Sequence, residues 1–562
     1  MRKKFIQLLR WSWTEKINNI KNVLITLFYC NLVQGGSRIH NILTKKVDSG
    51  RGAVSLHIFL ISNSMLPEWV LVHLSSLMDW MLFICFLFSF FITIVKKYPN
   101  IYITSTNLIA RWNHFGFNLR LIISTIATGN FLIVLWLWRG LDSYWPTYQS
   151  VFKLVDGYFA LDGLSINFLL LTTFLFAVLS IYLIFDWKMH INYINLCLLI
   201  EIFLLFSFST TNLLIFYIFF ESVLIPMFLM IIFWGSSQRK IKAAIYFLIY
   251  TLIGSIFLLF AIIYIYNAFG TLNYQNFEFN FLSKNEEIVL WIAFFLPFAV
   301  KIPMFPFHIW LPEAHVEAPT LGSIILASLL LKLGGYGFIR FTIPLFPYAN
   351  DYFFPLITML SITGILNASL AAMRQVDIKR IIAYSSIGHM NLIVLGIFSQ
   401  NECSQIGSVY LMIGHGIVSA ALFFCVGVLY DRYHTRLIHY YGGLAQTMPK
   451  FTFFFLVFSF ANMGFPGTIN FIGEFLILVG IFDVNFVSGV MASLSTVLSA
   501  IYSIYLFNRI NFGTIKSYMI TKNFIDLTTI EFFVLLLLLI ISILLGLNAN
   551  LILISFEIGS QI

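Results

Sequence analysis

The sequence has 562 residues, of which 60% are hydrophobic and only 10% are charged, and its mean hydropathy is +0.90. Soluble domains carry about 25% charged residues, so these figures exclude an ordinary soluble protein. The apolar runs often exceed the roughly 20 residues that cross a bilayer, and they are continuous rather than alternating, which disfavours a β-barrel. We therefore predict an all-α polytopic membrane protein.

The chain begins with a basic segment, which we predict to be an N-terminal extension over residues 1–70. Residues 1–51 hold ten Lys and Arg against only Glu15 and Asp48, and they supply +8 of the net charge of +9. A basic segment poor in acids is also typical of a transit peptide, but we expect this one to be retained. Its stretch 11–30 is predicted to lie along an anionic membrane surface or against a neighbouring subunit, rather than to bind nucleic acid.

Fourteen transmembrane helices are predicted from the apolar runs that follow. In chain order they lie near residues 76–95, 117–138, 160–185, 191–208, 211–234, 243–267, 288–311, 319–342, 352–372, 379–400, 405–430, 451–480, 486–507 and 530–550.

The loops after the odd-numbered helices are basic, which orients the chain. They carry Lys96, Lys97, Arg111, Arg239, Lys240, Lys242, Arg374, Lys379, Arg380, Arg432, Arg436, Arg509 and Lys516. Positive residues accumulate on the side of the cytoplasm or of the mitochondrial matrix, so we place these loops there. Both termini then fall on the opposite side, which sets the basic extension against the same rule.

Two predicted helices are interrupted, and their interruptions correspond when helices four to eight are laid against nine to thirteen. The seventh contains Pro297, Pro303 and Pro306, and the twelfth contains Pro466 between two glycines. Proline breaks a helix, and freed backbone groups are tolerated at membrane depth only where protein or water satisfies them. Broken helices at matching positions of two halves indicate a transport site, although a simple proline kink is the alternative.

Five ionisable residues lie near the middle of predicted helices: Glu201, Glu221, Lys301, Lys332 and Glu474. A charge at the centre of a bilayer costs about 2.5–3.5 kcal/mol on insertion scales. If all five were charged and unpaired, the free energy of inserting them would be comparable with the stability of a whole domain. Pairing or hydration is therefore required.

Glu221 is the natural partner for one of the lysines, and we pair it with Lys301. The proton affinity of a buried lysine depends on where its carboxylate lies, because attraction and desolvation act in opposite directions. That dependence is what a proton pump needs. A static buried ion pair that only fixes the helix register is the alternative.

Two histidines extend the series of ionisable residues. His389 has Ser385 and Ser386 on its own helical face, and His415 has Ser419 one turn on. Histidine titrates near neutral pH, which suits a proton relay, although a lone helical histidine can also be merely hydrogen-bonded.

Two further histidines follow the seventh helix. His308 lies seven residues after Lys301 and could share its face despite the intervening prolines. We expect His315, beyond Pro312, to lie in a loop.

Other chemistry is not indicated by the sequence. The cysteines stand singly, with no pair at metal or redox spacing, and we interpret them as small apolar residues. They are Cys30, Cys85, Cys197, Cys403 and Cys425. The doublet Gly334-Gly335 lies inside a predicted helix, where it favours close helix packing rather than phosphate binding.

Several strings resemble the antiporter-like subunits of respiratory complex I, NADH:ubiquinone oxidoreductase. The most specific is KIPMFPFHIWLPEAHVEAPTLGSIILASLLLKLGGYGFIRF. FALDGLSINFLLLTTF, MRQVDIKRIIAYSSIGHMNL, HGIVSAALFFCVGVLYDRYHTR, YGGLAQTMP and FPGTINFIGEFLILVG follow the same pattern in the same order. The EAHVEAPT string is similar to the chain 4 family and distinguishes it from chains 2 and 5.

The resemblance implies a fold of about fourteen helices with two inverted five-helix repeats, working in proton translocation. It implies the essential glutamate at Glu221, its paired lysine at Lys301, the central lysine at Lys332, the relay histidines at His389 and His415, and the exit glutamate at Glu474, which would govern exchange with the outer side. Glu201 and His308 are further candidates without an assigned role.

The resemblance also divides the chain and implies its surroundings. Residues 71–155 would hold the first transmembrane helices, 156–512 the antiporter-like core, and 513–562 a loop and the last helix. The partners would be other membrane-arm subunits of complex I, including chains 2 and 5, and membrane lipid such as cardiolipin. Flavin, iron–sulfur clusters and ubiquinone would belong to other chains, leaving no cofactor or metal in this one. Its abundance of Phe, Tyr, Ile and Asn favours the mitochondrial inner membrane.

Two alternatives to a complex I proton pump stay open at this point. A cation/proton antiporter subunit would share the fold and the charged positions, and a dependence on sodium would distinguish it. A purely structural spacer is favoured if the charges form dry, isolated pairs.

Overall fold

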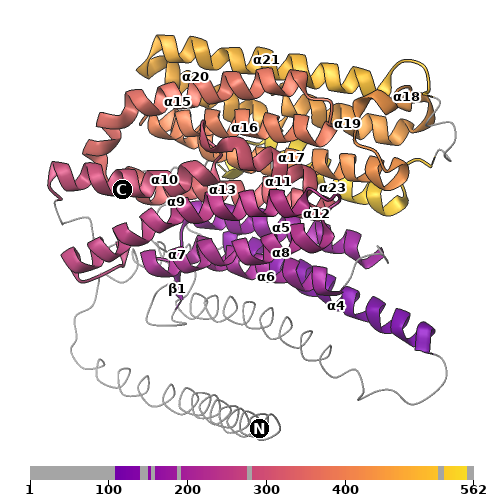
Figure 1. Ribbon diagram of the computed structural model, residues 1–562, viewed down its shortest axis with the longest axis horizontal. Helices are drawn as coiled ribbons and strands as arrows, with labels where there is room; N and C mark the ends of the chain where they lie inside the picture. The colour runs from indigo at the N-terminus through magenta and orange to yellow at the C-terminus, as the bar shows by residue number, and fades with distance from the viewer. Residues whose placement is uncertain are drawn as a thin grey trace, which may run out of the picture. The chain divides into compact units, whose positions relative to one another are not determined.

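The computed structural model describes residues 108–139, 150–152, 159–185, 191–274, 282–516 and 525–552, all within the compact unit Glu68–Ile562. The predicted extension over residues 1–70 and the predicted helix at 76–95 lie outside the described residues. The described helices run roughly parallel or antiparallel to one another (Figure 1).

The first part of the described chain forms a short hairpin and seven helices. They are α4 (Leu108–Arg139), β1 (Ser150–Phe152), β2 (Phe159–Leu161), α5 (Gly163–Phe185), α6 (Ile191–Ser209), α7 (Leu213–Ser222), α8 (Leu224–Trp234), α9 (Lys240–Phe269) and α10 (Lys284–Lys301). The strands β1 and β2 pair antiparallel, with Val151 opposite Ala160.

The middle of the chain is divided into short elements. They are η3 (Phe307–Ile309), α11 (Trp310–Glu317), α12 (Thr320–Ile325), η4 (Leu326–Leu330), α13 (Leu331–Gly337), η5 (Phe338–Thr342) and α14 (Ile343–Leu345).

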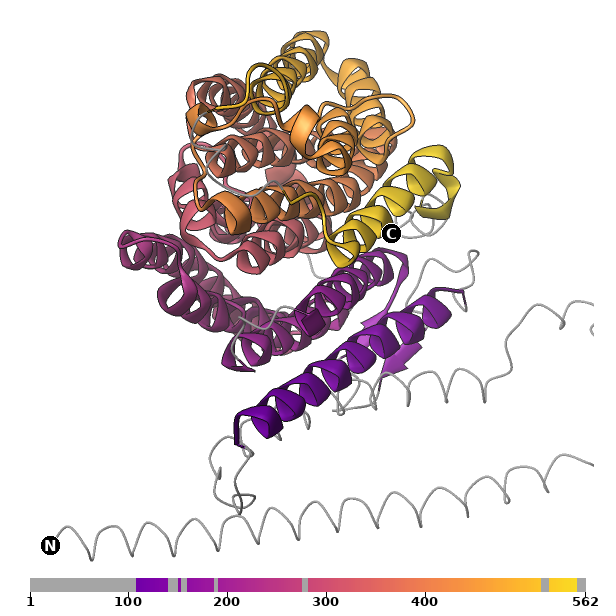
Figure 2. The same cartoon turned by 90° about the vertical axis from the view of Figure 1, so that its right-hand side faces the viewer.

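Longer helices complete the bundle. They are α15 (Pro347–Arg374), α16 (Ile378–Phe398), α17 (Glu402–Tyr433), η6 (Ile438–Tyr440), α18 (Leu444–Thr447), α19 (Pro449–Asn462), α20 (Ile469–Val484), α21 (Phe486–Asn511) and α23 (Thr529–Leu547). End-on, as in Figure 2, the indigo helix α4 lies at one edge of the helices.

Eleven of the predicted transmembrane helices are present among the described residues as helices long and apolar enough to cross a membrane. The chain is therefore a multi-span membrane protein. The most enclosed spans are α17, whose apolar window is 100% buried, and Thr320–Leu345, at 94%. By contrast α23, at 28%, turns most of its apolar surface outward. The core thus lies around the two spans that carry His415 and Lys332.

Both predicted interruptions are confirmed. Helix α10 ends at Lys301 and the chain becomes helical again only at η3, after Pro303 and Pro306, which cannot donate backbone hydrogen bonds. Helices α19 and α20 are separated by residues 463–468, where Gly464 and Gly467 adopt positive φ of 73° and 88°. Other residue types adopt such angles at a cost, so the glycines allow the chain to turn there.

The close packing predicted for Gly334-Gly335 is also confirmed. A Cβ atom at Gly334 would lie 2.6 Å from Ile302 Cγ1, and one at Gly335 would lie 2.3 Å from Met412 Sδ. These distances are far below van der Waals contact. At Gly334 a Cβ would also lie 3.0 Å from the backbone carbonyl of Phe298, so glycine is what allows this approach to α10, whereas at Gly335 the flexible Met412 side chain of α17 would have to move.

The last helix is anchored to α17 by one arginine. Arg432 donates through Nη1 and Nη2 to the two carboxylate oxygens of Glu531, at 3.0 and 2.6 Å, and through Nε to the carbonyl of Ile525 at 2.8 Å. Both side chains are nearly buried, at 13% and 9% exposure. Such a bidentate pair holds its partners in one fixed geometry.

We expect Glu531→Gln to loosen α23, because it leaves the Arg432 charge without its counter-charge while a glutamine can still cap the helix. The loss should reach about 2–3 kcal/mol, somewhat below that for a fully buried pair. Hydrogen exchange of α23 amides in the purified protein should then accelerate about 30-fold or more. Glu313→Gln breaks the half-exposed pair with Arg380 and should change exchange in α11 by less than about fivefold. Equal effects would contradict the anchoring role.

Candidate functional site

Lys332 lies at the centre of an irregular span. Two π-helical turns, η4 and η5, flank the short helix α13 that carries it. The side chain is fully buried, and its Nζ donates to the carbonyl of Ala327 at 2.7 Å. Turns of this width are often found at functional sites, and here the lysine nitrogen is held by the backbone of its own span.

The second partner of Lys332 is a histidine from another helix. Nζ lies 2.8 Å from Nδ1 of His415 on α17, which is also buried. A lysine ammonium has only donors, so Nδ1 must accept and the neutral ring then carries its hydrogen on Nε2. Nε2 of His415 is buried with no partner among the described side chains. The pair is arranged for transfer of one proton from Nζ to Nδ1.

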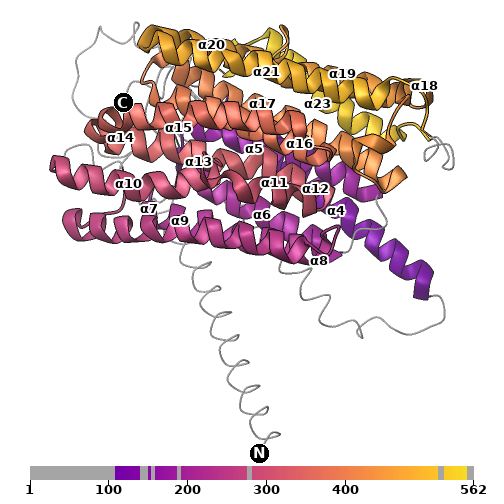
Figure 3. The same cartoon turned by 45° about the horizontal axis from the view of Figure 1, so that its top comes forward.

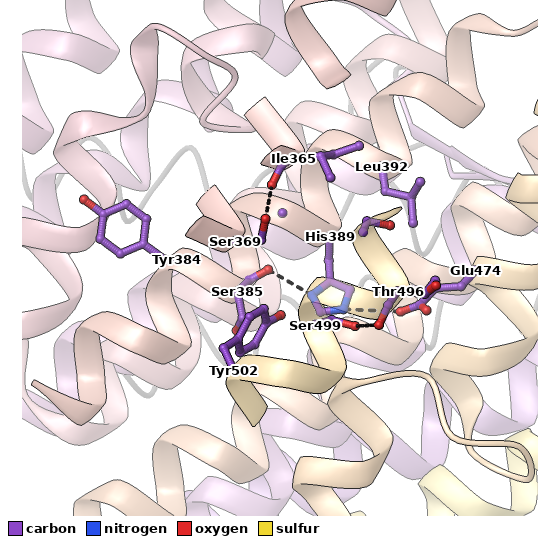
Figure 4. Close-up of a pocket in the computed structure, with 12 residues that line it drawn as sticks. Ile365, Ser369, Tyr384, Ser385, His389, Leu392, Glu474, Thr496, Ser499 and Tyr502 are labelled. Atoms are coloured by element: carbon purple, nitrogen blue, oxygen red, sulfur yellow. Dashed lines mark hydrogen bonds and ion pairs between the residues drawn. The ribbon is translucent and has the colours of Figure 1, made fainter. Parts of the chain in front are cut away.

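His389 on α16 and Glu474 on α20 form a second pair. Nδ1 of His389 lies 2.9 Å from the carbonyl of Ser385, so Nδ1 must be the donor. Nε2 lies 3.2 Å from Oε1 of Glu474 (Figure 4). A stable contact there requires a proton on one of those two atoms. Both residues are 5% exposed, so His389 and Glu474 meet in a buried place.

The two pairs stand next to each other. The rings of His415 and His389 lie 5.5 Å apart, centre to centre. Lys332, His415, His389 and Glu474 therefore form one series across α13, α17, α16 and α20. Of the serines on these helical faces, Ser385 contacts His389 through its backbone carbonyl, and the Ser419 hydroxyl donates to the carbonyl of Gly416.

The structure places Glu221 and Lys301 near each other, but without the direct ion pair that the sequence predicts. Nζ of Lys301 donates to the carbonyl of Phe220 at 3.2 Å and lies 3.9 Å from the centre of the Phe220 ring. The Glu221 carboxylate remains within electrostatic range of Lys301 and lies beside Ser255. The lysine thus contacts the backbone at the residue before the glutamate.

Two of the site residues predicted from the sequence, Glu201 and His308, lie outside this series. Glu201 on α6 accepts a hydrogen bond from Asn130 of α4 at 3.2 Å. His308 belongs to the 3₁₀ turn η3, because the break after Lys301 ends the helix, so it does not continue the helical face of Lys301.

The expectation of a loop at His315 is wrong. Pro312 falls in the first turn of α11, where proline is tolerated, and the helix continues through His315. The imidazole is fully buried and stacks on Phe423 at 4.7 Å.

Two buried cations were missed by the sequence reading. Arg340 pairs with Asp162 and its Nε donates to the hydroxyl of Tyr336. Its place inside a predicted helix was a signal that could have found it. Lys379, which the sequence assigns to a basic loop, is 3% exposed, and its Nζ donates to Ala318 and Ser323.

The described residues contain no group of three or more His, Cys, Asp or Glu side chains placed to hold a metal ion. Cys197 and Cys425 are buried, as expected for small apolar residues, whereas Cys403 is exposed at the start of α17.

A multi-span bundle with broken helices and a buried series of titratable side chains defines the class of antiporter-like membrane subunits. The family model described as NADH:quinone oxidoreductase/Mrp antiporter matches residues 210–501. A solved chain of respiratory complex I from Thermus thermophilus has a TM-score of 0.71 at 30% identity, covering 78% of this chain and 94% of its own length. A chain of the Mrp complex from Dietzia, at 17% identity and a TM-score of 0.71, covers 85% of this chain and 96% of its own length and shows the shared fold alone.

Two curated relatives narrow the class. NADH-ubiquinone oxidoreductase chain 4 of Chondrus crispus is 49% identical over 76% of this chain and 88% of its own length. The protein of the same name from Marchantia polymorpha is 50% identical over 71% of this chain and 82% of its own length. The chain belongs to the NADH-ubiquinone oxidoreductase chain 4 family.

Proposed function

We propose that the chain is a proton-translocating subunit in the membrane arm of NADH:ubiquinone oxidoreductase, driven by electron transfer from NADH to ubiquinone in other subunits. The family membership supports the complex. The observation that carries the proton-translocating role is the buried series Lys332, His415, His389 and Glu474, in which each neighbouring pair is placed to share or pass a proton.

The geometry suggests how a proton moves along the series. Nζ of Lys332 gives its proton to Nδ1 of His415, 2.8 Å away. The ring then releases the proton on Nε2, and a water molecule or a small ring rotation carries it across to the His389–Glu474 pair. In this proposal that pair holds one proton between its two facing atoms, so a second arrival forces one proton onward. Transfer along the series therefore needs no large movement of helices.

Glu221 and Lys301 act as the switch in this proposal. In the observed state Lys301 is held by the Phe220 carbonyl, beside the glutamate. If the Glu221 carboxylate swings onto Lys301, the ion pair stabilises the charged lysine. The pair also weakens the repulsion between Lys301 and neighbouring ammonium groups along the membrane centre. Moving one proton against 100 mV takes about 2.3 kcal/mol. Making or breaking a buried ion pair involves energies of that order or larger.

The proposal includes the architecture and surroundings of the subunit. Eleven spans, the two broken helices and the predicted helix at 76–95 make fourteen transmembrane helices. Ten of these form two inverted five-helix repeats. The subunit lies in the mitochondrial inner membrane, next to the antiporter-like chains 2 and 5, with cardiolipin among its lipids. It carries no redox cofactor, since the flavin, iron–sulfur clusters and ubiquinone are bound elsewhere in the complex.

The proposal is tested by Glu221→Ala in the assembled complex, reconstituted in liposomes. Loss of the switch should reduce the number of protons pumped per NADH and slow coupled electron transfer, each by severalfold. Asp351→Ala, which removes an exposed carboxylate of α15, is the matched control and should leave both unchanged. Normal pumping in both Glu221→Ala and Lys332→Ala would refute the proposed function.

A further inference from the structure

Gly464 lies directly against the carboxylate of Glu474. A Cβ atom built on Gly464 would be 2.4 Å from Oε2 and 3.1 Å from Cδ of that side chain. Packed carbon atoms normally keep about 3.5 Å or more from their neighbours. The other oxygen, Oε1, faces Nε2 of His389 at 3.2 Å (Figure 4). The carboxylate therefore has the histidine ring next to one oxygen and the backbone of Gly464 next to the other.

The break between α19 and α20 is what brings these two residues together. The two helices follow one another along the upper edge of Figure 3, and the chain turns between them, where Gly464 has a positive φ of 73°. In an unbroken helix, residues ten positions apart are separated by about 15 Å along the axis. The turn at the break instead places Gly464 in contact with Glu474.

The end of the break nearer α19 is held by hydrogen bonds. The backbone nitrogen of Gly464 donates to the carbonyl of Ala461 at 3.3 Å. Asn462, the last residue of α19, is buried and lies within hydrogen-bonding reach of the Tyr502 hydroxyl on α21. These contacts restrain the backbone at Gly464.

The end of the break nearer α20 is held by the last helix. A Cβ atom on Gly546 of α23 would lie 2.4 Å from the carbonyl oxygen of Gly467 and 2.7 Å from the carbonyl carbon of Thr468. Helix α23 therefore packs directly on the backbone of the break. The Tyr410 hydroxyl of α17 donates to the carbonyl of Leu545, next to this glycine. The last helix, itself bound to α17, thus restrains this end of the break.

We propose that Gly464 is a positioning residue for Glu474. Its backbone, restrained through α19, α21 and α23, lies against Oε2 and so keeps Oε1 in contact with His389. This inference rests on the proposed function, in which the His389–Glu474 pair belongs to the proton-carrying series. It gives Gly464 a role beyond that of a residue that allows the chain to turn.

A methyl group at position 464 has to displace the carboxylate rather than the backbone. The carboxylate is the end of a flexible side chain, whereas the break is restrained at both ends. The two oxygens belong to one planar group, so a shift of Oε2 also changes the 3.2 Å contact between Oε1 and Nε2 of His389. A misplacement of about 1 Å can slow a reaction by about 100-fold.

Gly464→Ala in the assembled complex, reconstituted in liposomes, tests the proposal. Proton pumping by this subunit should fall at least about tenfold at a normal amount of complex. Gly467→Ala is the matched control, because Gly467 has a positive φ of 88° in the same break but nothing within 4 Å of its Cβ position. Both variants carry the backbone cost of a left-handed alanine, and only the first displaces the carboxylate. Equal pumping in the two would overturn the proposal.

A double variant shows whether Gly464 acts through Glu474. In Glu474→Ala the space beside Gly464 is empty, so Gly464→Ala should lower the melting temperature of the complex by less than it does beside the glutamate. Equal losses in the two backgrounds would contradict the contact.

The same pair of variants keeps the test informative if Gly464→Ala alone does not assemble. Recovery of assembly in the double variant would then support the proposal, and failure of the double variant where Glu474→Ala assembles would overturn it. Melting temperatures do not depend on pumping, so the two ideas are separable. Normal pumping in both Lys332→Ala and Glu221→Ala refutes the proposed function whatever the melting temperatures show.

Discussion

Lys332→Met is expected to stop proton translocation through this subunit while leaving the complex assembled. The methionine fills the space of the lysine, and replacing a buried charge by an apolar group of similar volume costs little. The series loses its first donor, since no Nζ faces Nδ1 of His415. Pumping by this subunit should fall on the order of 100-fold, the usual contribution of a positioned proton-transfer group. The measurement is proton uptake by reconstituted complex at a known rate of NADH oxidation.

The Lys332→Arg variant shows whether Lys332 carries protons or only supplies a static positive charge. Arginine keeps the positive charge but does not release its proton. If Lys332 only balances charge in a structural spacer, the arginine variant should pump normally, and if it carries protons, the variant should fail like Lys332→Met. Lys242→Met removes an exposed lysine at the start of α9 and should have no effect. Normal amounts of complex on native gels would exclude misassembly as the cause.

The residues of the series could be predicted from the sequence because charge inside an apolar run is rare and costly. Lys332 and Glu474 stood out for that reason alone, and the helix breaks near Lys301 and Glu474 followed from proline and glycine. The contacts could not be predicted in the same way. That Lys332 faces His415 depends on the approach of two helices at Gly335 and on two π turns, neither of which has a periodic signal.

Some contacts and positions differ from the predictions because they depend on packing that has no periodic signal in the sequence. Glu221 and Lys301 are paired by charge and by the family resemblance, but in the structure Nζ of Lys301 donates to the carbonyl of Phe220, at 3.2 Å, while Glu221 stays within electrostatic range. His315 was assigned to a loop because Pro312 precedes it, yet proline is compatible with the first turn of α11. Lys379 was counted with the loops because it stands among other basic residues, while the structure buries it against Ala318.

Glu474→Gln gives the second large effect that we expect. With Nδ1 of His389 donating to Ser385, Nε2 of the neutral ring is an acceptor, and the amide of a glutamine can donate to it. The variant should therefore keep the contact between α16 and α20 and assemble normally. It cannot, however, hold and release a proton, because an amide does not titrate in this range. We expect pumping to fall at least about tenfold.

The comparison with Glu474→Ala shows whether the proton or the contact matters. Alanine removes both and leaves His389 without its partner, so that variant should lose thermal stability as well as pumping. Glutamine should retain stability and lose only pumping, and Glu402→Gln, at an exposed carboxylate of α17, should lose neither. Normal pumping in Glu474→Gln would mean that the His389–Glu474 contact serves only to join two helices. The series of proton-carrying residues would then end at the histidines.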